Sequence, residues 1–107
     1  MKTLTYEFDA TTPPARPAHV GVVGSGDLEV LLEPGTRNKA SVRVRTSVQG
    51  FDEIWQTTLE RFFARNQVSG SWELNDSAAT PALVTLRLLQ AAQASGATPA
   101  TQDGEQP

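Results

Sequence analysis

Cysteine is absent from this 107-residue sequence, and histidine occurs only once, as His19. Without cysteine the chain has no disulfide framework, no thiolate metal site and no cysteine nucleophile. His19 has no other metal-ligand residues around it, so we expect no metal site. Sulfur chemistry by the protein itself is therefore excluded, and metal chemistry is not expected.

Excess positive charge and long apolar runs are also missing. Nine Lys and Arg residues stand against twelve Asp and Glu residues, a net charge of −3, which gives no electrostatic reason to bind nucleic acid or an anionic membrane. No apolar run approaches the length of a membrane span, and the first residues, MKTLTYEF, alternate between polar and apolar. We expect a cytoplasmic protein whose charge suits docking on a more basic partner.

The length of the chain limits what it can do alone. A domain of this size buries only somewhat more than about 60% of its unfolded surface, so it has one modest core. Little room remains for a deep internal active site. Catalysis by this chain alone is therefore not expected.

Two hydrophobic periods divide the chain. Apolar and polar residues alternate in most of the first half, which is the period of a half-buried strand, whereas later apolar residues recur at spacings of three and four, as in an amphipathic helix. We predict strands at residues 3–9, 19–23, 28–32, 40–48 and 70–74, and helices at residues 51–66 and 81–92. The strand at 40–48 is expected to run antiparallel to its predecessor.

The predicted buried faces follow from the same periods. In the strand at 40–48, the residues expected on the buried face are Val42, Val44, Thr46 and Val48. In the first helix they are Phe51, Ile54, Trp55, Leu59, Phe62 and Phe63. In the second helix they are Leu83, Val84, Leu86 and Leu89.

The second helix has a recognisable start. Thr80 is suited to cap the helix N-terminus, and Pro81 is suited to its first position. The β-branched residues in LVTL keep a strand open as the alternative for residues 81–92. The sequence therefore predicts a small single α+β domain, a mostly antiparallel sheet with two helices packed on one face. We place this domain at residues 1–94 and expect a disordered tail at 95–107, which has no large apolar residue.

The segment Gly24-Ser25-Gly26-Asp27 interrupts two strand-like runs and is expected to be a hairpin tip or bulge. The dinucleotide fingerprint needs a small residue where Glu29 stands, and the phosphate-loop pattern lacks its Gly-Lys-Ser/Thr ending. A nucleophile elbow needs glycine where Val23 stands. None of these motifs is present.

The residues alone allow two interpretations of the segment. The first is a tight turn, in which glycine supplies positive φ and the polar side chains bond the local backbone. The second is a serine hydrolase built from Ser25, Asp27 and His19, but nothing in the sequence supplies an oxyanion hole or a substrate pocket. The isolated motif favours the turn.

The wider segment VGVVGSGDLEVLLEP resembles the modification segment of the malonate decarboxylase acyl carrier family, the delta subunit of the biotin-independent enzyme. TSV at residues 46–48, the aromatic-rich helix and ATPALVTLRLLQA at 79–91 keep the family's order and spacing. The layout is more distantly similar to the citrate lyase acyl carrier subunit, which lacks the first strand. The resemblance covers residues 2–92.

The resemblance implies that Ser25 carries 2'-(5''-phosphoribosyl)-3'-dephospho-CoA through a phosphodiester and that the chain has no catalytic residue. On this reading Gly24 and Gly26 leave clearance for a transferase, because side chains there would hinder its approach. Asp27 could be read by that transferase, although an exposed turn aspartate is the simpler interpretation. Arg43 and Arg45 could contact the phosphates of the prosthetic group, although an outward-facing strand pair is the simpler interpretation.

The partners implied by the resemblance are the acetyl-malonyl transfer and decarboxylase subunits, the prosthetic-group transferase and the acyltransferase that loads the arm. An acetyl thioester would exchange with malonate, and decarboxylation of the malonyl thioester would regenerate it. A carrier for a citrate-lyase-like complex and a non-covalent interaction module remain as alternatives.

Overall fold

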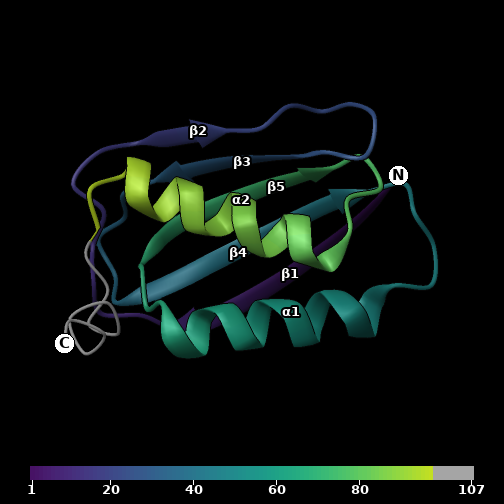
Figure 1. The fold of residues 1–107 in the computed structure, drawn as a ribbon. Coiled ribbons are helices and arrows are strands. Elements are labelled where there is room, and N and C mark those ends of the chain that lie inside the picture. Colours follow the sequence, from purple (N-terminus) through teal and green to yellow (C-terminus); the bar gives the residue numbers. More distant parts are fainter. Residues whose placement is uncertain (98–107) are drawn as a thin grey trace, which may run out of the picture.

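Alternating side chains build one twisted sheet, and the two amphipathic segments that follow build helices against it (Figure 1). The computed structural model describes residues 1–97. Its strands are β1 (Lys2–Asp9), β2 (Ala18–Val20), β3 (Leu28–Glu33), β4 (Lys39–Thr46) and β5 (Gly70–Asp76). Its helices are α1 (Asp52–Arg65) and α2 (Pro81–Ala94). Residues 81–92 are thus helical, and the strand alternative is wrong.

The strand order is β1-β4-β5-β3-β2, and every neighbouring pair is antiparallel except β4 and β5. These two are parallel because α1 carries the chain back along the sheet before β5 begins. β4 runs antiparallel to β3, as predicted, but the two strands are not neighbours, since β5 lies between them. The mostly antiparallel α+β sheet is confirmed.

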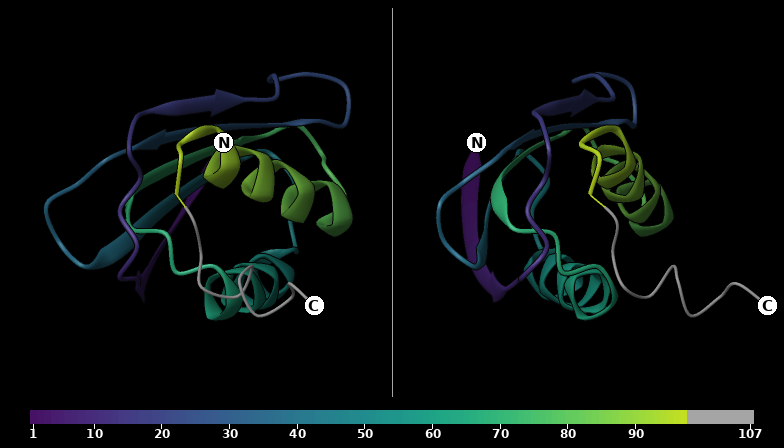
Figure 2. Two further views of the ribbon diagram at one scale, coloured as in Figure 1. Left: turned by 60° about the vertical axis from the view of Figure 1, so that its left-hand side comes forward. Right: turned by 90° about the vertical axis from the view of Figure 1, so that its left-hand side faces the viewer.

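Both helices lie on the same face of the sheet, as Figure 2 shows from two further directions. α2 packs over β2 and β3, and α1 packs against β1 and α2. The core between the layers holds an aromatic cluster in which the ring centroids of Phe8 and Phe63 are 4.9 Å apart and those of Phe63 and Trp72 are 5.3 Å apart. The predicted two-layer arrangement is confirmed.

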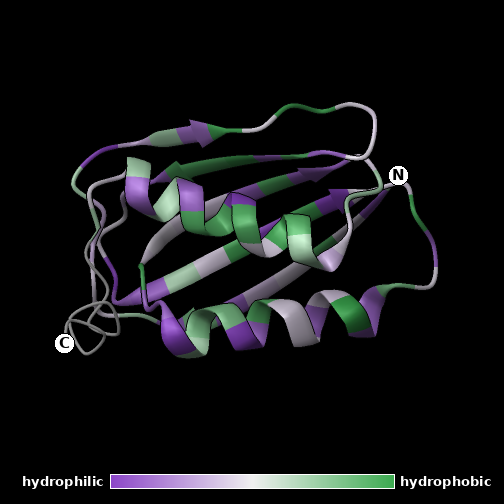
Figure 3. Cartoon of the chain, viewed as in Figure 1, coloured by the Kyte–Doolittle hydropathy of each residue, from purple (hydrophilic) through white to green (hydrophobic). Residues whose placement is uncertain are grey.

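Apolar residues occur along both helices (Figure 3); many of them are buried in the core, but some are exposed. Phe51, Ile54 and Leu86 are 47%, 44% and 47% exposed, so their predicted burial is wrong. On α2 the fully buried leucine is Leu88, which lies one turn after the buried Val84. Leu86 falls on the opposite side of the helix because two residues correspond to about 200° of rotation.

The ends of α2 are fixed by local contacts. The Thr80 hydroxyl accepts a hydrogen bond from the Leu83 N–H at 3.2 Å, as predicted for the N-cap, and Pro81 holds the first position. After α2 the chain stays packed through Ala97, because the Ser95 carbonyl accepts hydrogen bonds from the N–H groups of Ala15 and Arg16. Residues 98–107 of the expected tail lie outside the described residues. Among residues 1–97, neither helix is long and apolar enough to cross a membrane.

Candidate functional site

The β2–β3 hairpin closes through a seven-residue loop, residues 21–27, at one end of the sheet (Figure 1). β2 ends at Val20, so the predicted strand at 19–23 is too long, and Val22 and Val23 are about 60% exposed in the loop. Ser25 lies at the exposed tip. The expectation of a hairpin tip around Ser25 is confirmed.

The side chain of Asp27 accepts hydrogen bonds from both ends of this loop. Its Oδ1 accepts from the Leu28 N–H at 2.7 Å, and its Oδ2 accepts from the Val22 N–H at 3.2 Å. The Asp27 N–H donates to the Gly24 carbonyl at 2.9 Å, which closes the turn over Ser25. Both ends of the loop are therefore tied to one side chain.

Arg87 on α2 completes the arrangement. Its Nε donates to Asp27 Oδ1 at 2.8 Å and its Nη2 donates to Oδ2 at 3.1 Å, while its Nη1 donates to Gln90. The two side chains are mostly shielded, with 16% of Asp27 and 24% of Arg87 exposed. A two-pronged guanidinium–carboxylate pair fixes direction as well as distance, so the loop is held to α2 in one orientation.

The hydrogen bonds from Arg87, joined by that from the Leu28 N–H, lower the pKa of Asp27 from its ordinary value of 3.8 to about 2. Asp27 is therefore an anion at any physiological pH. Its charge is already met by Arg87, which makes it a structural acceptor within the loop. Each of its carboxylate oxygens accepts two hydrogen bonds, so Asp27 has no lone pair left to accept from the Ser25 hydroxyl.

Two glycines are required by the backbone of the loop. Gly21 has φ +75°, and a Cβ there would lie 1.9 Å from the Leu28 carbonyl oxygen, so no side chain fits. Gly26 has φ +77° but faces open space. Gly24 has neither restriction, and a Cβ there would meet nothing within 4 Å. Nothing in the described residues thus requires glycine at position 24.

Ser25 has φ +31°, which an L residue rarely adopts. The turn closed by Asp27 holds it there. Among residues 1–97 no hydrogen bond engages the Ser25 hydroxyl, which leaves the oxygen open to solvent. An exposed hydroxyl on a rigid, strained turn is well placed to enter the cleft of another protein.

The hydrolase alternative does not form. The His19 Nε2 lies 2.8 Å from Glu29 Oε2 on the open face of the sheet, and Asp27 is engaged by Arg87. No histidine therefore bridges Ser25 and Asp27, which is the contact that a catalytic triad requires.

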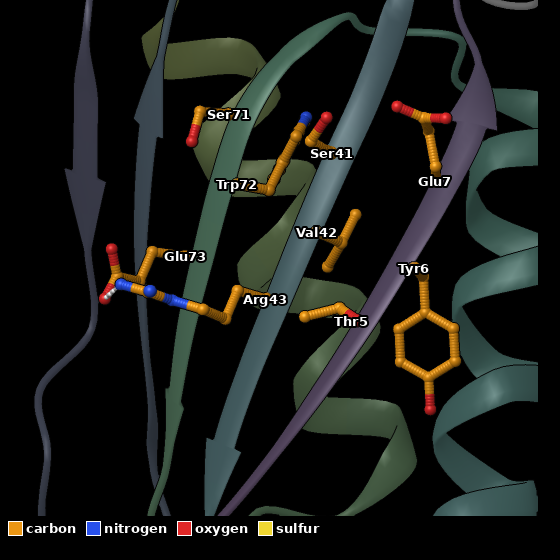
Figure 4. Close-up of a pocket in the computed structure, with 9 residues that line it drawn as sticks. All are labelled: Thr5, Tyr6, Glu7, Ser41, Val42, Arg43, Ser71, Trp72 and Glu73. Carbon is orange, nitrogen blue, oxygen red and sulfur yellow. Dashed lines mark hydrogen bonds and ion pairs between the residues drawn. The ribbon is translucent and has the colours of Figure 1, made fainter.

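A hollow of about 570 Å³ lies on the open face of the sheet, opposite the helices. Figure 4 shows Arg43 reaching across to Glu73, with Thr5 beside Arg43 and Ser41 farther along β4. Arg43 Nη2 and Glu73 Oε2 are 2.8 Å apart, so this arginine is neutralised three strands away from β2. The hollow is lined by polar and apolar side chains alike, and Arg43 and Glu73 in its lining are engaged with each other. The outward-facing interpretation of Arg43 is supported.

No group of three or more potential metal-ligating side chains is found within residues 1–97. Arg87 and Gly21 are the site residues that sequence reasoning missed. Arg87 is sixty positions from Asp27 and resembles any other helical arginine in the sequence. Gly21 carried a local signal, because a glycine between two strand-forming valines is costly unless the backbone needs it.

Comparisons with known proteins identify the family of this chain. The profile of the malonate decarboxylase delta subunit (MdcD) family matches residues 15–95. Malonate decarboxylase acyl carrier proteins of Pseudomonas fluorescens SBW25 and Pseudomonas savastanoi pv. phaseolicola are 48% and 50% identical, each over 84% of this chain and 92% of its own. A chain of a solved Pseudomonas malonate decarboxylase hetero-tetramer in complex with malonate has a TM-score of 0.80 and 47% identity, over 87% of this chain and 97% of that chain. This chain belongs to the malonate decarboxylase delta subunit family of acyl carrier proteins.

Proposed function

We propose that the chain is the acyl carrier subunit of a malonate decarboxylase and that Ser25 is the residue to which its prosthetic group is attached. The carrier role is supported by the family and by relatives of about 50% identity over nearly their whole length. The observation that carries the assignment of Ser25 is its exposed, unengaged hydroxyl on a loop clamped by Asp27 and Arg87.

The loop fits a bulky phosphoribosyl-dephospho-CoA group. Ser25 is exposed, and a side chain at Gly24 or Gly26 would meet only open space. In the proposed attachment, the Ser25 oxygen forms a new P–O bond at a phosphoanhydride presented by the transferase, and its proton passes to a base of that enzyme. The anhydride P–O bond breaks, and the remainder of the phosphate chain leaves with the bridging oxygen. The scaffold supplies a fixed nucleophile position and no catalysis of its own.

When attached, the group supplies a terminal thiol on which acyl groups are held as thioesters. Residues of this chain hold the root of that arm, and Ser25 takes no part in turnover. Tethering raises the effective concentration of the acyl group at each partner site. The absence of cysteine means that no protein thiol of this chain competes for the acyl group.

The proposed partners follow from this role. The similar solved chain is part of a hetero-tetramer in complex with malonate. We assign to this chain a place beside the acetyl-malonyl transfer and decarboxylase subunits, together with transient visits to a prosthetic-group transferase and an acyltransferase. The reaction centre lies in those partners, and this chain is a non-catalytic subunit.

Intact-mass measurement tests the proposal. Co-production with matching transferases should add the mass of one prosthetic group to the wild-type chain, and Ser25→Ala should stay at its unmodified mass. Ser47→Ala removes another exposed serine hydroxyl outside the loop and should be modified like wild type. An unchanged wild-type mass with transferases proven active on a relative would overturn the carrier role, and a modified Ser25→Ala would overturn the site.

A further inference from the structure

A small apolar pocket of about 150 Å³ lies between the N-terminal ends of α1 and α2. Its walls include Phe51, Ile54 and Trp55 from α1 and the segment before it, and Ala79 and Val84 from the start of α2. Phe51 and Ile54 are nearly half exposed at this place, although aromatic and branched apolar side chains favour burial. The side chains of α2 do not cover Phe51 and Ile54 here, so two apolar residues at the start of α1 remain in contact with solvent.

The pocket lies next to the loop that carries Ser25. The Ser77 N–H donates to the Asp27 carbonyl at 3.0 Å, and the following residue, Ala78, lines the pocket. Figure 1 places the β2–β3 loop and the first turns of both helices at the same end of the molecule. One backbone hydrogen bond therefore joins the loop that carries Ser25 to a segment that lines the pocket.

The size of the pocket restricts its occupant. An apolar cavity of about 150 Å³ accepts a molecule as small as benzene, whereas whole-ligand sites measure about 300 Å³ or more. The pocket is too small for a nucleotide or a peptide segment. It can hold a terminal acetyl group together with the thioester sulfur and the adjoining methylenes.

We infer that this pocket holds the acetyl thioester end of the prosthetic arm between visits to partner subunits and leaves the malonyl form outside. This inference rests on the proposed attachment at Ser25. Burial of the neutral acetyl end removes apolar surface from water on both sides, including that of Phe51 and Ile54. It also shields the thioester carbonyl from water.

The polar groups of the pocket favour the neutral acetyl end. Asp76 and Thr58 contribute the polar side chains of the lining, and no basic side chain is among the described residues that line it. Each oxygen of the Asp76 carboxylate already accepts one hydrogen bond, Oδ2 from the Thr46 hydroxyl at 2.8 Å and Oδ1 from the Ala79 N–H at 2.9 Å. A malonyl carboxylate would enter without a partner and next to this acidic side chain, which costs free energy in a desolvated site.

The selectivity has a functional consequence. The acetyl form is the resting state expected between catalytic cycles, and the malonyl form is the one that a decarboxylase subunit must reach. A pocket that holds only the acetyl form protects that thioester from water and leaves the malonyl form free to reach the decarboxylase subunit. A pocket lined by lysine or arginine would instead offer the malonyl carboxylate an ion-pair partner and would not exclude the malonyl form.

The experiment uses the full chain carrying its arm, with attachment verified by intact mass. Methyl and indole NMR signals are compared among the free-thiol, acetyl and malonyl forms. We expect the signals of Ile54, Val84 and Trp55 to shift in the acetyl form only. Ala79→Leu should fill the pocket and abolish these shifts, whereas Ala82→Leu adds the same three carbons at an exposed position of α2 outside the pocket and should keep them.

A chemical readout accompanies the spectra. The rate at which hydroxylamine cleaves the acetyl thioester should rise about threefold in Ala79→Leu if about two thirds of the arm is pocket-bound in the wild type, because only the exposed fraction reacts. Ala82→Leu should react like wild type. Thermal unfolding of each variant verifies that both remain folded.

The outcomes separate the two proposals. If no arm attaches to the wild type, the proposed function fails and this inference fails with it. If the arm is attached but the acetyl and malonyl forms give the same pocket signals, or hydroxylamine rates are unchanged in Ala79→Leu, the inference is overturned while the attachment at Ser25 stands. Pocket shifts that occur only on addition of partner subunits would assign the pocket to a partner side chain and would also overturn it.

Discussion

Arg87 and Asp27, sixty positions apart in the sequence, form a two-pronged ion pair that ties the second helix to the loop of the proposed modification site. The guanidinium contacts both carboxylate oxygens, at 2.8 and 3.1 Å. Because the same carboxylate also accepts from the Val22 and Leu28 N–H groups, the position of Ser25 depends on a residue of α2. We therefore propose that Arg87 positions Ser25 for attachment.

Arg87→Lys should slow attachment of the prosthetic group without unfolding the domain. Lysine presents a point charge and cannot contact both oxygens in a fixed plane, so the loop samples more orientations. Misplacement of a reacting group by about 1 Å can cost up to about 100-fold, and we expect a loss of about 10-fold or more in the rate of mass gain.

The matched control for this change is Arg43→Lys, which alters an exposed ion pair on the open face of the sheet. It should leave the attachment rate unchanged. Equal rates for wild type and Arg87→Lys, measured by time-resolved intact mass, would show that the ion pair does not position Ser25.

Gly21→Ala should damage the fold and Gly24→Ala should not. A Cβ at position 21 would overlap the Leu28 carbonyl and sit on a backbone with φ +75°, so we expect a cost well above about 1 kcal/mol in unfolding free energy. Alanine at position 24 meets nothing within 4 Å and should change stability by less than about 0.5 kcal/mol. Urea titrations measure both.

The clearance role of Gly24 has its own readout. Gly24→Ala should lower the rate of attachment at Ser25 although the free protein is as stable as wild type, because the added methyl group lies where the transferase must approach. A normal attachment rate would leave Gly24 without a role in recognition.

Acid should weaken the loop in a defined window. The pKa of Asp27 is lowered from 3.8 to about 2 in the folded protein, so the unfolded chain binds its proton first as the pH falls. The stability that the charged carboxylate contributes is complete above about pH 4 and is lost between about pH 4 and pH 2.

Comparison with Asp27→Asn isolates this contribution, because the other carboxylates titrate in both proteins. The difference in urea midpoint between wild type and Asp27→Asn should be constant from pH 7 to about pH 4 and should then shrink toward pH 2. A difference that stays constant down to pH 2 would contradict the assigned role of the charge.

The orientation of α2 can be tested by two leucines two residues apart. Leu88 is fully buried against the sheet, and Leu88→Ala should cost about 2–5 kcal/mol in unfolding free energy because it leaves a cavity. Leu86 is 47% exposed, and Leu86→Ala should change stability by less than about 0.5 kcal/mol. Similar losses for both variants would mean that the helix is rotated from the position described here.

Several features of the fold and site could be predicted from local sequence. Alternation placed Val42, Val44 and Thr46 on the buried face of β4, and Thr80 with Pro81 marked the start of α2. The serine between two glycines indicated an exposed hairpin tip. These features depend on the period of the backbone and on residues a few positions apart, which the sequence lists in order.

The remaining features needed the tertiary structure. Strand order, the exposure of Ile54 and Leu86, and the contact of Arg87 with Asp27 each depend on which distant segments meet. The period of a helix shows that it has an apolar stripe, but the packing of a neighbouring helix decides how far along that stripe burial extends. The sequence by itself thus determined the elements and the exposed serine. Only the fold decided what holds that serine in place, because long-range pairing is selected by the sum of packing and electrostatic contacts over the whole domain.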